Sequence, residues 1–203
     1  MSLSSTRAEA GSGDSLALLQ RAQNGDAESF GELCRLYEGR LLRQATLLNP
    51  GCAEDLVQEC LFGAWKNIHH YRGRCQFFTW LCAIMLNQHR NMIRKRWPIA
   101  FSTLFKWKKA EKLVVEIPDP GRHPDQIAEV SERILYVQKC IHRLSPKHRE
   151  VIHLRFYVDD SLEGIANALG CSIGTVKSRL FNALGNLREM TAETAAQSRS
   201  AEL

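Results

Sequence analysis

The stretch SLEGIANALGCSIGTVKSRL, residues 161–180, decides the fold class of this chain. Ser161 is a good N-cap for a short helix, and Gly170 is a good C-terminal stop for it. Ser172 caps a second helix, which we expect to run to about Met190. Two helices joined by a short turn that contains glycine predict a helix-turn-helix.

The apolar residues of these two predicted helices can pack together, which leaves a polar face on the second helix. The residues expected at the contact are Ile165, Ala166, Leu169, Ile173, Val176 and Leu180. The residues left on or near the exposed surface are Ser172, Thr175, Lys177, Ser178 and Arg179. Small side chains let a backbone approach a groove, while hydroxyls and cations reach phosphates and base edges. The pattern predicts a DNA-recognition helix, and the alternative is a solvated helix end with ordinary charges.

Composition and charge narrow the class of protein. The chain has 203 residues and a formal net charge of +5, from 27 Lys and Arg against 22 Asp and Glu. Because this excess is small, the position of the charges matters more than their sum. The best apolar run, Phe77 to Leu86, is shorter than the ~20 residues of a membrane span, and the N-terminus lacks a secretory signal. We therefore expect a cytoplasmic protein with no membrane insertion.

The seven cysteines predict buried thiols rather than disulfides or a metal site. Their number is odd, no CxxC pair occurs, and the expected compartment is reducing. Those within apolar helical patterns are Cys34, Cys60 and Cys82. The alternative is a zinc site drawn from Cys75, Cys82 and His69 or His70, but these residues lack the usual ligand spacing. We expect no cofactor and no metal, and the sequence shows no catalytic constellation.

The rest of the chain has helical periodicity and no strand pattern, which predicts an all-α fold. Helices are expected over 16–23, from Asp26 onward, and over 53–68, 77–96 and 127–144. A further helix restarts at Ser145-Pro146, with Val151, Ile152, Leu154 and Phe156 on its apolar side. The predicted organisation is a disordered tail 1–14, a helical domain 15–97, an irregular linker 98–126, a second helical domain 127–190 and a tail 191–203.

The first predicted domain also carries groups suited to nucleic acid. The loop HHYRGRCQF, residues 69–77, places Tyr71 and Phe77 beside Arg72 and Arg74, which is the chemistry of stacking on an extruded base. The alternative is a capped turn with Tyr71 in the core. Amides and cations suited to a phosphate backbone follow on the next helix: Asn87, Arg90, Asn91, Arg94, Lys95 and Arg96. Asp55, Gln58 and Glu59 form an acidic and amide face that suits a basic partner, or else a solvated surface.

Two motif sets in this order resemble one protein family. LSPKHREVIHLRFYVDDSLEGIANALGCSIGTVKSRLFNALGNLRE, residues 144–189, is similar to region 4 of the sigma-70 family, in its extracytoplasmic-function (ECF) group. AEDLVQECLFGAW (53–65) and YRGRCQFFTWLCAIMLNQHRNMIRKR (71–96) resemble region 2 of the same family. Two independent sets separated by a linker are more specific than either alone.

The resemblance implies a non-enzymatic transcription initiation factor that binds core RNA polymerase and promoter DNA. It implies that the first domain reads the −10 element through the loop and helix residues named above. It implies that the second domain reads the −35 element through Arg149, Ser172, Thr175, Lys177, Ser178 and Arg179. The implied polymerase contacts are the β′ clamp helices, through Asp55, Gln58 and Glu59, and the β subunit. An inhibitory anti-sigma factor is a further family expectation.

The sequence departs from the family pattern in three places. Gly164 stands where the family usually has Glu, so Ser161 lacks a capping-box partner and its helix should be weaker. Directly after Leu180 the family commonly has more arginines, whereas residues 181–185 are Phe, Asn, Ala, Leu and Gly here. The linker is unusually basic, with Lys106, Lys108, Lys109 and Lys112, and their role is open.

Two rival functions stand beside this one. The first is a stand-alone helix-turn-helix regulator, which would bind DNA tightly without polymerase. The second is a Cys/His metalloenzyme or metal sensor, which would hold metal.

Overall fold

The computed structural model describes residues 12–96 and 124–201. These residues form helices and no strand, so the all-α prediction is confirmed. The chain divides into two compact units, up to Met92 and from Ile93. We call the first four α-helices the N lobe and the last four the C lobe. The predicted linker, 98–126, and its four lysines lie almost entirely outside the described residues, as does most of the predicted tail 1–14.

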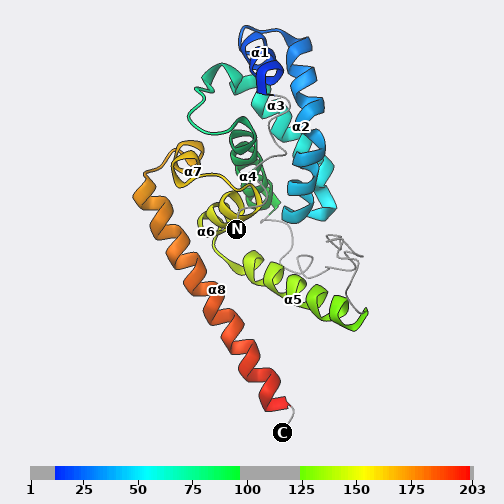
Figure 1. Cartoon of the computed structure of the whole chain (residues 1–203), viewed down its shortest axis with the longest axis vertical. Coiled ribbons are helices and arrows are strands. Elements are labelled where there is room, and N and C mark those ends of the chain that lie inside the picture. Colours follow the sequence, from blue (N-terminus) through cyan, green and yellow to red (C-terminus); the bar gives the residue numbers. More distant parts are fainter. Residues whose placement is uncertain (1–11, 97–123, 202–203) are drawn as a thin grey trace. The chain divides into compact units, whose positions relative to one another are not determined.

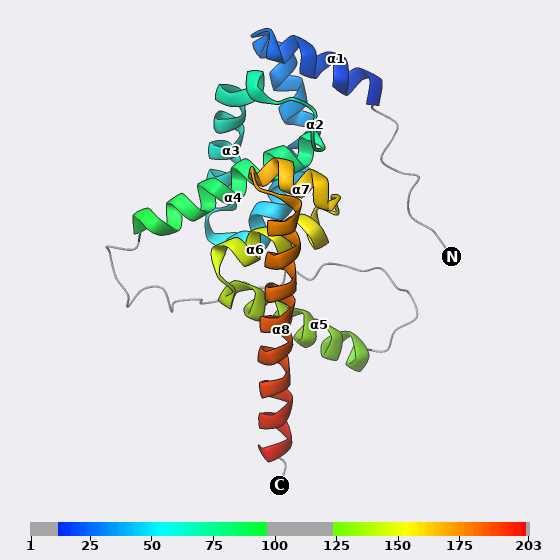
Figure 2. The same cartoon turned by 90° about the vertical axis from the view of Figure 1, so that its left-hand side faces the viewer.

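The N lobe is built from α1 (Ser12–Gln23), α2 (Ala27–Leu48), α3 (Ala53–Asn67) and α4 (Phe77–Arg96), with short 3₁₀ turns η1 (Pro50–Cys52) and η2 (Ile68–His70). Asp26 caps α2, since its carboxylate accepts hydrogen bonds from the backbone N–H groups of Glu28 and Ser29. Gly25 has φ +92 and ends the first helix, as predicted. Helix α1 lies across one end of α2, where Figures 1 and 2 also place the η2 turn.

The interior of the N lobe is apolar and closely packed. The large side chains that are fully buried include Leu33, Leu41, Leu56, Leu81 and Met85. Helices α3 and α4 approach closely at Gly63, because a Cβ added there would lie 3.2 Å from Cγ2 of Ile84. This packing fixes the exposed sides of α3 and α4, on which the predicted contact residues lie.

The C lobe contains α5 (Pro124–Arg143), α6 (Pro146–Ile152), a π-helical turn η3 (His153–Tyr157), α7 (Leu162–Leu169) and α8 (Ile173–Ala201). Figure 1 shows α6 and α7 against the first half of α8 and α5 beside its middle. Val151, Leu154, Ile165 and Val176 are fully buried at the centre. A second cluster of Leu144, Ile152 and Ala183 joins the end of α5 to α8.

Two details of the C lobe differ from the prediction. Phe156, expected on an apolar side, is 59% exposed. The physical reason is η3: the Val158 N–H donates to the His153 carbonyl at 3.2 Å, so the turn holds an additional residue and the positions after Leu154 rotate. Helix α8 also continues to Ala201, well beyond the predicted end at Met190.

A side-chain hydrogen bond helps to anchor the extended α8 to α5. The Tyr136 hydroxyl donates to the Met190 carbonyl at 2.8 Å. Apolar contacts of Ile141, Leu187 and Met190 with the second cluster lie along the same helix pair. No described helix has both the length and the apolar composition of a membrane span.

Candidate nucleic-acid interface

The turn before α8 is closed by backbone hydrogen bonds. Gly170 is left-handed, with φ 62 and ψ 40, which suits glycine at a helix end. Its N–H donates to the Asn167 carbonyl at 3.3 Å, and the Cys171 N–H donates to the Ala166 carbonyl at 3.0 Å. The carbonyls of Ala166 and Asn167, near the end of α7, therefore have hydrogen-bond donors, and these bonds fix the turn that leads to α8. The predicted helix-turn-helix is present.

Two of the predicted DNA-binding hydroxyls cap the start of α8. Ser172 Oγ accepts a hydrogen bond from the Thr175 N–H at 3.1 Å, and the Ser172 and Thr175 hydroxyl oxygens lie 2.9 Å apart. A hydroxyl has one donor and two acceptor positions, so each retains capacity for a phosphate or a base edge. The first turn of α8 is thus ordered before any ligand arrives.

The orientation of α8 is set by Val176, which is fully buried. Lys177 and Ser178 follow it on the exposed side, whereas Arg179 is half-buried. The structure therefore brings the predicted residues of α8 together at its N-terminal end. Of the two cations among them, Lys177 is more exposed than Arg179.

Phe181 lies on the same exposed side, and the sequence analysis missed it. Its side chain is 78% exposed, more than any other large apolar residue described. Phe181 is four residues after Lys177 and three after Ser178, a spacing that places all three on one helix face. This spacing could have revealed it. Phenylalanine at such a position can contact a thymine methyl group in a major groove.

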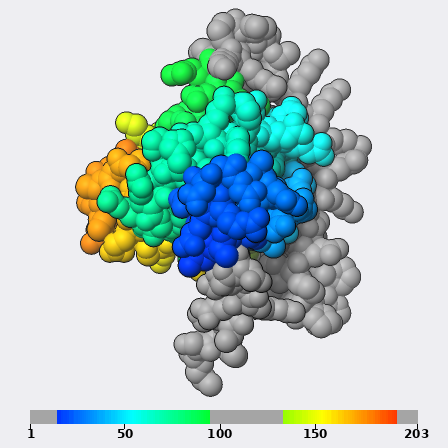
Figure 3. All heavy atoms as spheres, turned by 90° about the horizontal axis from the view of Figure 1, so that it is seen from above, coloured from blue at the N-terminus to red at the C-terminus, as the bar shows by residue number. Residues whose placement is uncertain are grey.

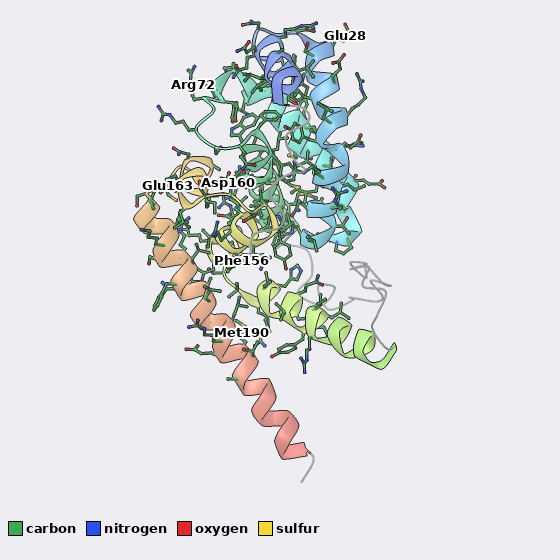
Figure 4. The ribbon with its side chains drawn as sticks, viewed as in Figure 1. Glu28, Arg72, Phe156, Asp160, Glu163 and Met190 are labelled. Atoms are coloured by element: carbon green, nitrogen blue, oxygen red, sulfur yellow. The ribbon has the colours of Figure 1, made fainter. Side chains whose placement is uncertain are left out.

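The start of α7 is capped differently from the family pattern. Ser161 Oγ accepts from the Gly164 N–H at 2.9 Å, so the predicted cap forms. The buried Asp160 carboxylate accepts from the Ser161 N–H at 2.6 Å (Figure 4 labels Asp160). A Cβ added to Gly164 would lie only 2.6 Å from Asp160 Cγ. A side chain at 164 and this carboxylate exclude each other, so Asp160 supplies the acceptor that a family Glu would have supplied.

Arg149 has a structural task that the sequence analysis did not predict. Its Nη2 donates to the carbonyls of His142 at 2.6 Å and Leu144 at 3.1 Å, at the end of α5. Burial lowers the pKa of the guanidinium, while the neighbouring Glu150 raises it. These bonds tie α6 to α5. The contact of Arg149 with DNA stays a prediction.

In the N lobe, Tyr71 is packed in a closed turn, as the alternative interpretation has it. Its hydroxyl donates to the Cys75 carbonyl at 2.6 Å, and its ring centroid lies 5.3 Å from Phe77 and 5.4 Å from Trp80. Both Tyr71 and Phe77 are half-buried. Stacking of either ring on an extruded base stays a prediction.

The same turn presents two guanidinium groups. Arg72 and Arg74 are exposed on either side of Gly73, which has φ +68. Figure 4 shows Arg72 extending away from the helices of its lobe. We refer to residues 71–76 as the arginine loop.

Helix α4 carries a polar face after the arginine loop. Asn87, Arg90, Asn91 and Arg94 are three, four and seven residues apart, which places them on one side of the helix. All are exposed except Asn91, which is half-buried. Arg90 Nη2 donates to Asn87 Oδ1 at 2.6 Å, so the predicted track is partly organised already. Lys95 lies on the last turn of the same helix.

Helix α3 exposes all three residues of the predicted docking face, Asp55, Gln58 and Glu59. The face continues to Phe62, which is 57% exposed and which the sequence analysis missed. The Lys66 ammonium lies 4.0 Å from the centroid of the Phe62 ring. An exposed aromatic bordered by carboxylates is typical of an interface anchor.

Three cysteines of the N lobe, Cys52, Cys60 and Cys82, are buried, whereas Cys34, also expected to be buried, and Cys75 are half-buried. Cys60 and Cys82 are fully buried, and burial raises the pKa of Cys60 to about 12 and that of Cys82 further. Cys60 Sγ donates to the Leu81 carbonyl at 3.2 Å. A high pKa leaves little reactive thiolate. Within the described ranges, no three His, Cys, Asp or Glu side chains are grouped to hold a metal ion.

The fold and the cationic end of α8 define the chain as a helix-turn-helix DNA-binding protein. Comparison with known proteins narrows this class. The family model "Sigma-70 region 2" matches residues 34–99, and "Sigma-70, region 4" matches residues 140–189. The RNA polymerase sigma factor NccH of Alcaligenes xylosoxydans xylosoxydans is 32% identical, over 84% of this chain and 91% of the relative.

Two further comparisons agree. The ECF RNA polymerase sigma-E factor of Haemophilus influenzae is 29% identical, over 82% of this chain and 89% of the relative. The solved structure of the sigma factor RpoE from Bartonella quintana, in complex with the anti-sigma factor NepR, is similar with a TM-score of 0.56 and 27% identity, over 82% of this chain and 98% of that one. The chain belongs to the sigma-70 family, in its ECF group, and is a transcription initiation factor.

Proposed function

We propose that this chain binds core RNA polymerase in the cytoplasm and directs it to promoters, reading the −10 element with the N lobe and the −35 element with the C lobe. The proposed domains are residues 15–97 and 127–190, joined by the linker 98–126. The observation that carries the proposal is the exposed end of α8, where Lys177, Ser178 and Phe181 stand over a buried helix-turn-helix core.

For the −35 element, the N-terminal half of α8 enters the major groove. Lys177 and Arg179 supply phosphate or base contacts, Ser172, Thr175 and Ser178 supply hydroxyls, and Phe181 supplies an apolar contact. The satisfied turn at Gly170 supports this, because it presents the helix start without a cost of ordering on binding.

For the −10 element, the arginine loop and the polar face of α4 receive single-stranded DNA. The cations of Arg72 and Arg74 on the loop and of Arg90 and Arg94 on α4 are exposed and neutralise phosphates. Tyr71 and Phe77 are packed against Trp80 and half-buried, so a base would stack on the part of a ring that stays exposed.

For polymerase, we propose that the α3 face docks on the β′ clamp helices, while a second contact involves the β subunit. Phe62 is the apolar anchor of this face, and Asp55, Gln58 and Glu59 surround it with polar groups. We also propose an anti-sigma factor as a regulatory partner, since the similar RpoE structure was solved with one.

The experiment is run-off transcription with purified core polymerase on genomic fragments, with mapping of the start sites. The proposal expects defined starts that require this chain. Lys177→Ala or Arg179→Ala should weaken binding to the mapped −35 duplex and lower the salt slope by about 1 if a phosphate contact is lost. Arg188→Ala, an exposed arginine later on α8, is the matched control.

The docking face is tested in the same system. Asp55→Ala with Gln58→Ala should weaken binding to core polymerase and leave the fold unchanged, while Glu38→Ala on α2 serves as control. Unchanged capture of core polymerase by the double variant would contradict the docking face. Tight duplex binding by the chain alone, with no association with polymerase, would favour the stand-alone regulator instead.

A further inference from the structure

The carbonyls at the start of the arginine loop are held by a side chain from a different helix. Gln23, the last residue of α1, donates from Nε2 to the Tyr71 carbonyl at 2.7 Å and to the Ile68 carbonyl at 3.1 Å. These partners are 45 and 48 residues away in sequence. Figure 3 shows α1 on the surface of the N lobe beside the segment that leads into the loop.

These two bonds restrict the direction in which the Arg72 side chain leaves the backbone. The Tyr71 carbonyl belongs to the same planar peptide unit as the Arg72 N–H. A donor fixed on that carbonyl therefore fixes the plane from which the Arg72 side chain departs. The Ile68 carbonyl also accepts from the Tyr71 N–H at 3.1 Å, so Gln23 holds both ends of the turn that precedes the loop.

A second side-chain bond of the loop, from the Tyr71 hydroxyl, is local and does not replace the bonds of Gln23. The Tyr71 hydroxyl closes the loop on Cys75 from inside, and Gly73 has a left-handed φ of 68, which gives the tip conformational freedom. The Gln23 side chain joins the loop to α1. Loops lack the internal hydrogen bonds of a helix, so their shape depends on such external donors.

We propose that Gln23 is a positioning residue for −10 recognition: by bonding the Ile68 and Tyr71 carbonyls, it sets the direction in which the arginine loop presents Arg72 to the single-stranded promoter segment. This inference rests on the proposed function of the N lobe. It adds a residue of α1 that does not itself touch DNA.

The test compares isosteric variants in holoenzyme assembled with core polymerase. Gln23→Glu keeps the shape of the side chain but places carboxylate oxygens against two carbonyl oxygens, and Gln23→Ala removes the donor without repulsion. Gln20→Glu makes the same change on an exposed residue of the same helix and is the control. The DNA is a promoter fragment recovered by mapping wild-type start sites.

Strand opening is read by permanganate oxidation of unpaired thymines, and −35 occupancy by nuclease protection. For Gln23→Glu we expect about tenfold less opening, a smaller loss for Gln23→Ala, and unchanged opening for Gln20→Glu. Occupancy at −35 and affinity for core polymerase should change less than about twofold. The salt dependence of opening should also become shallower in Gln23→Glu by about one phosphate contact, because a smaller folded fraction would lower opening equally at every salt concentration.

Unchanged opening in either folded Gln23 variant would overturn the inference. So would a parallel loss of opening, −35 occupancy and polymerase binding with an unchanged salt dependence, since that result means lost fold rather than lost position. Failure of the proposed function looks different: wild-type holoenzyme would then open no promoter fragment at all.

Discussion

The two lobes hold their proposed DNA-facing segments in different ways. In the C lobe the segment is a helix, whose backbone groups are bonded within α8, so it needs only a buried side at Val176 and Ala183 and a hydroxyl cap. In the N lobe it is a loop, whose carbonyls are bonded by the side chains of Gln23 and Tyr71. The first arrangement depends on apolar packing and the second on a few directional bonds.

Because of this difference, variants of the two lobes should affect different properties: the stability of the C lobe and the position of loop residues in the N lobe. Loss of a buried methylene group lowers the stability of the whole lobe, because packing is shared among many neighbours. Loss of one hydrogen bond to a loop carbonyl lowers stability little but releases the direction of the residues that follow it. We therefore expect core variants of the C lobe to act through the folded fraction, and bond variants of the N lobe to act through position.

The largest effect is expected for Ile165→Ala in α7. Ile165 is fully buried, so its truncation should lower the free energy of unfolding of the C lobe by about 3 kcal/mol. Ile173→Ala, at a position 37% exposed, is the matched control and should cost less than about 1 kcal/mol. Thermal unfolding followed by circular dichroism measures both.

Tryptophan fluorescence sharpens this comparison between lobes. Trp65 and Trp80 lie in the N lobe, and the described helices of the C lobe carry no tryptophan. With Trp97 and Trp107 replaced by Phe, the fluorescence transition should stay in place when Ile165→Ala shifts the circular dichroism transition. A fluorescence transition that shifts equally would mean that the lobes unfold as one unit.

A smaller effect on the free energy of unfolding is expected at Gly164, and its sign should depend on whether Asp160 is present. Alanine there collides with the buried Asp160 carboxylate, so Gly164→Ala should destabilise the C lobe by about 2 kcal/mol. In an Asp160→Ala background the same change should be favourable, because alanine has the higher helix propensity, by up to about 1 kcal/mol. Chemical denaturation of the four proteins gives the coupling between the two sites.

Gly174→Ala provides the control, since a Cβ there meets only Ser172 Oγ at an ordinary 3.7 Å. It should be neutral or stabilising in both backgrounds. If Gly164→Ala costs the same with and without Asp160, the carboxylate does not dictate the glycine.

The sequence predicted those features that depend on local chemistry. The caps at Asp26, Ser145 and Ser161 and the stops at Gly25 and Gly170 follow from neighbouring residues, and each is present. Phe156 was predicted wrongly because a π-helical turn breaks the 3.6-residue period, and no sequence signal was found for that turn.

The parts of the candidate site that depend on distant residues were not predictable in the same way. The bonds of Gln23 to residues 68 and 71 and of Arg149 to the end of α5 exist only after the helices have packed. The exposure of Phe62 and Phe181 also depends on which side of each helix is buried, although their spacing from Asp55 and Lys177 already pointed to the correct face.

The next effect concerns the charged cap of the N lobe. Hydrogen bonds from the Ser29 side chain and backbone, together with Arg21, lower the pKa of Asp26 from 3.8 to about 2. Because the folded state has the lower pKa, the stabilisation is present above pH 4 and is lost as pH falls toward 2. Asn caps helices about as well as Asp but does not titrate in this range.

We therefore expect Asp26→Asn to flatten the acid dependence of N-lobe stability between pH 4 and pH 2. Denaturant midpoints measured by tryptophan fluorescence across this range compare the two proteins. Asp26 caps α2 of the N lobe, so the effect of its replacement should be confined to that lobe. Parallel curves for wild type and variant would contradict the role of this carboxylate.

The smallest effect is expected at Asp159, a left-handed position that is not occupied by glycine. Both described left-handed positions of the N lobe are glycine, Gly25 and Gly73, whereas the C lobe has Gly170 at one and Asp159, with φ 60, at the other. Aspartate tolerates this region better than most residues, but glycine has no steric cost there and loses more entropy on folding. The two terms nearly offset, so Asp159→Gly should raise the free energy of unfolding by about 0.5 kcal/mol, while Asp159→Ala should lower it by about 1 kcal/mol. Denaturant unfolding of the three proteins measures their free energies of unfolding, which should fall in the order Gly, Asp, Ala at position 159. An alanine variant as stable as the glycine variant would contradict this order. It would mean that the bonds of Asp160 and Ser161 hold the turn before α7 whatever residue stands at 159.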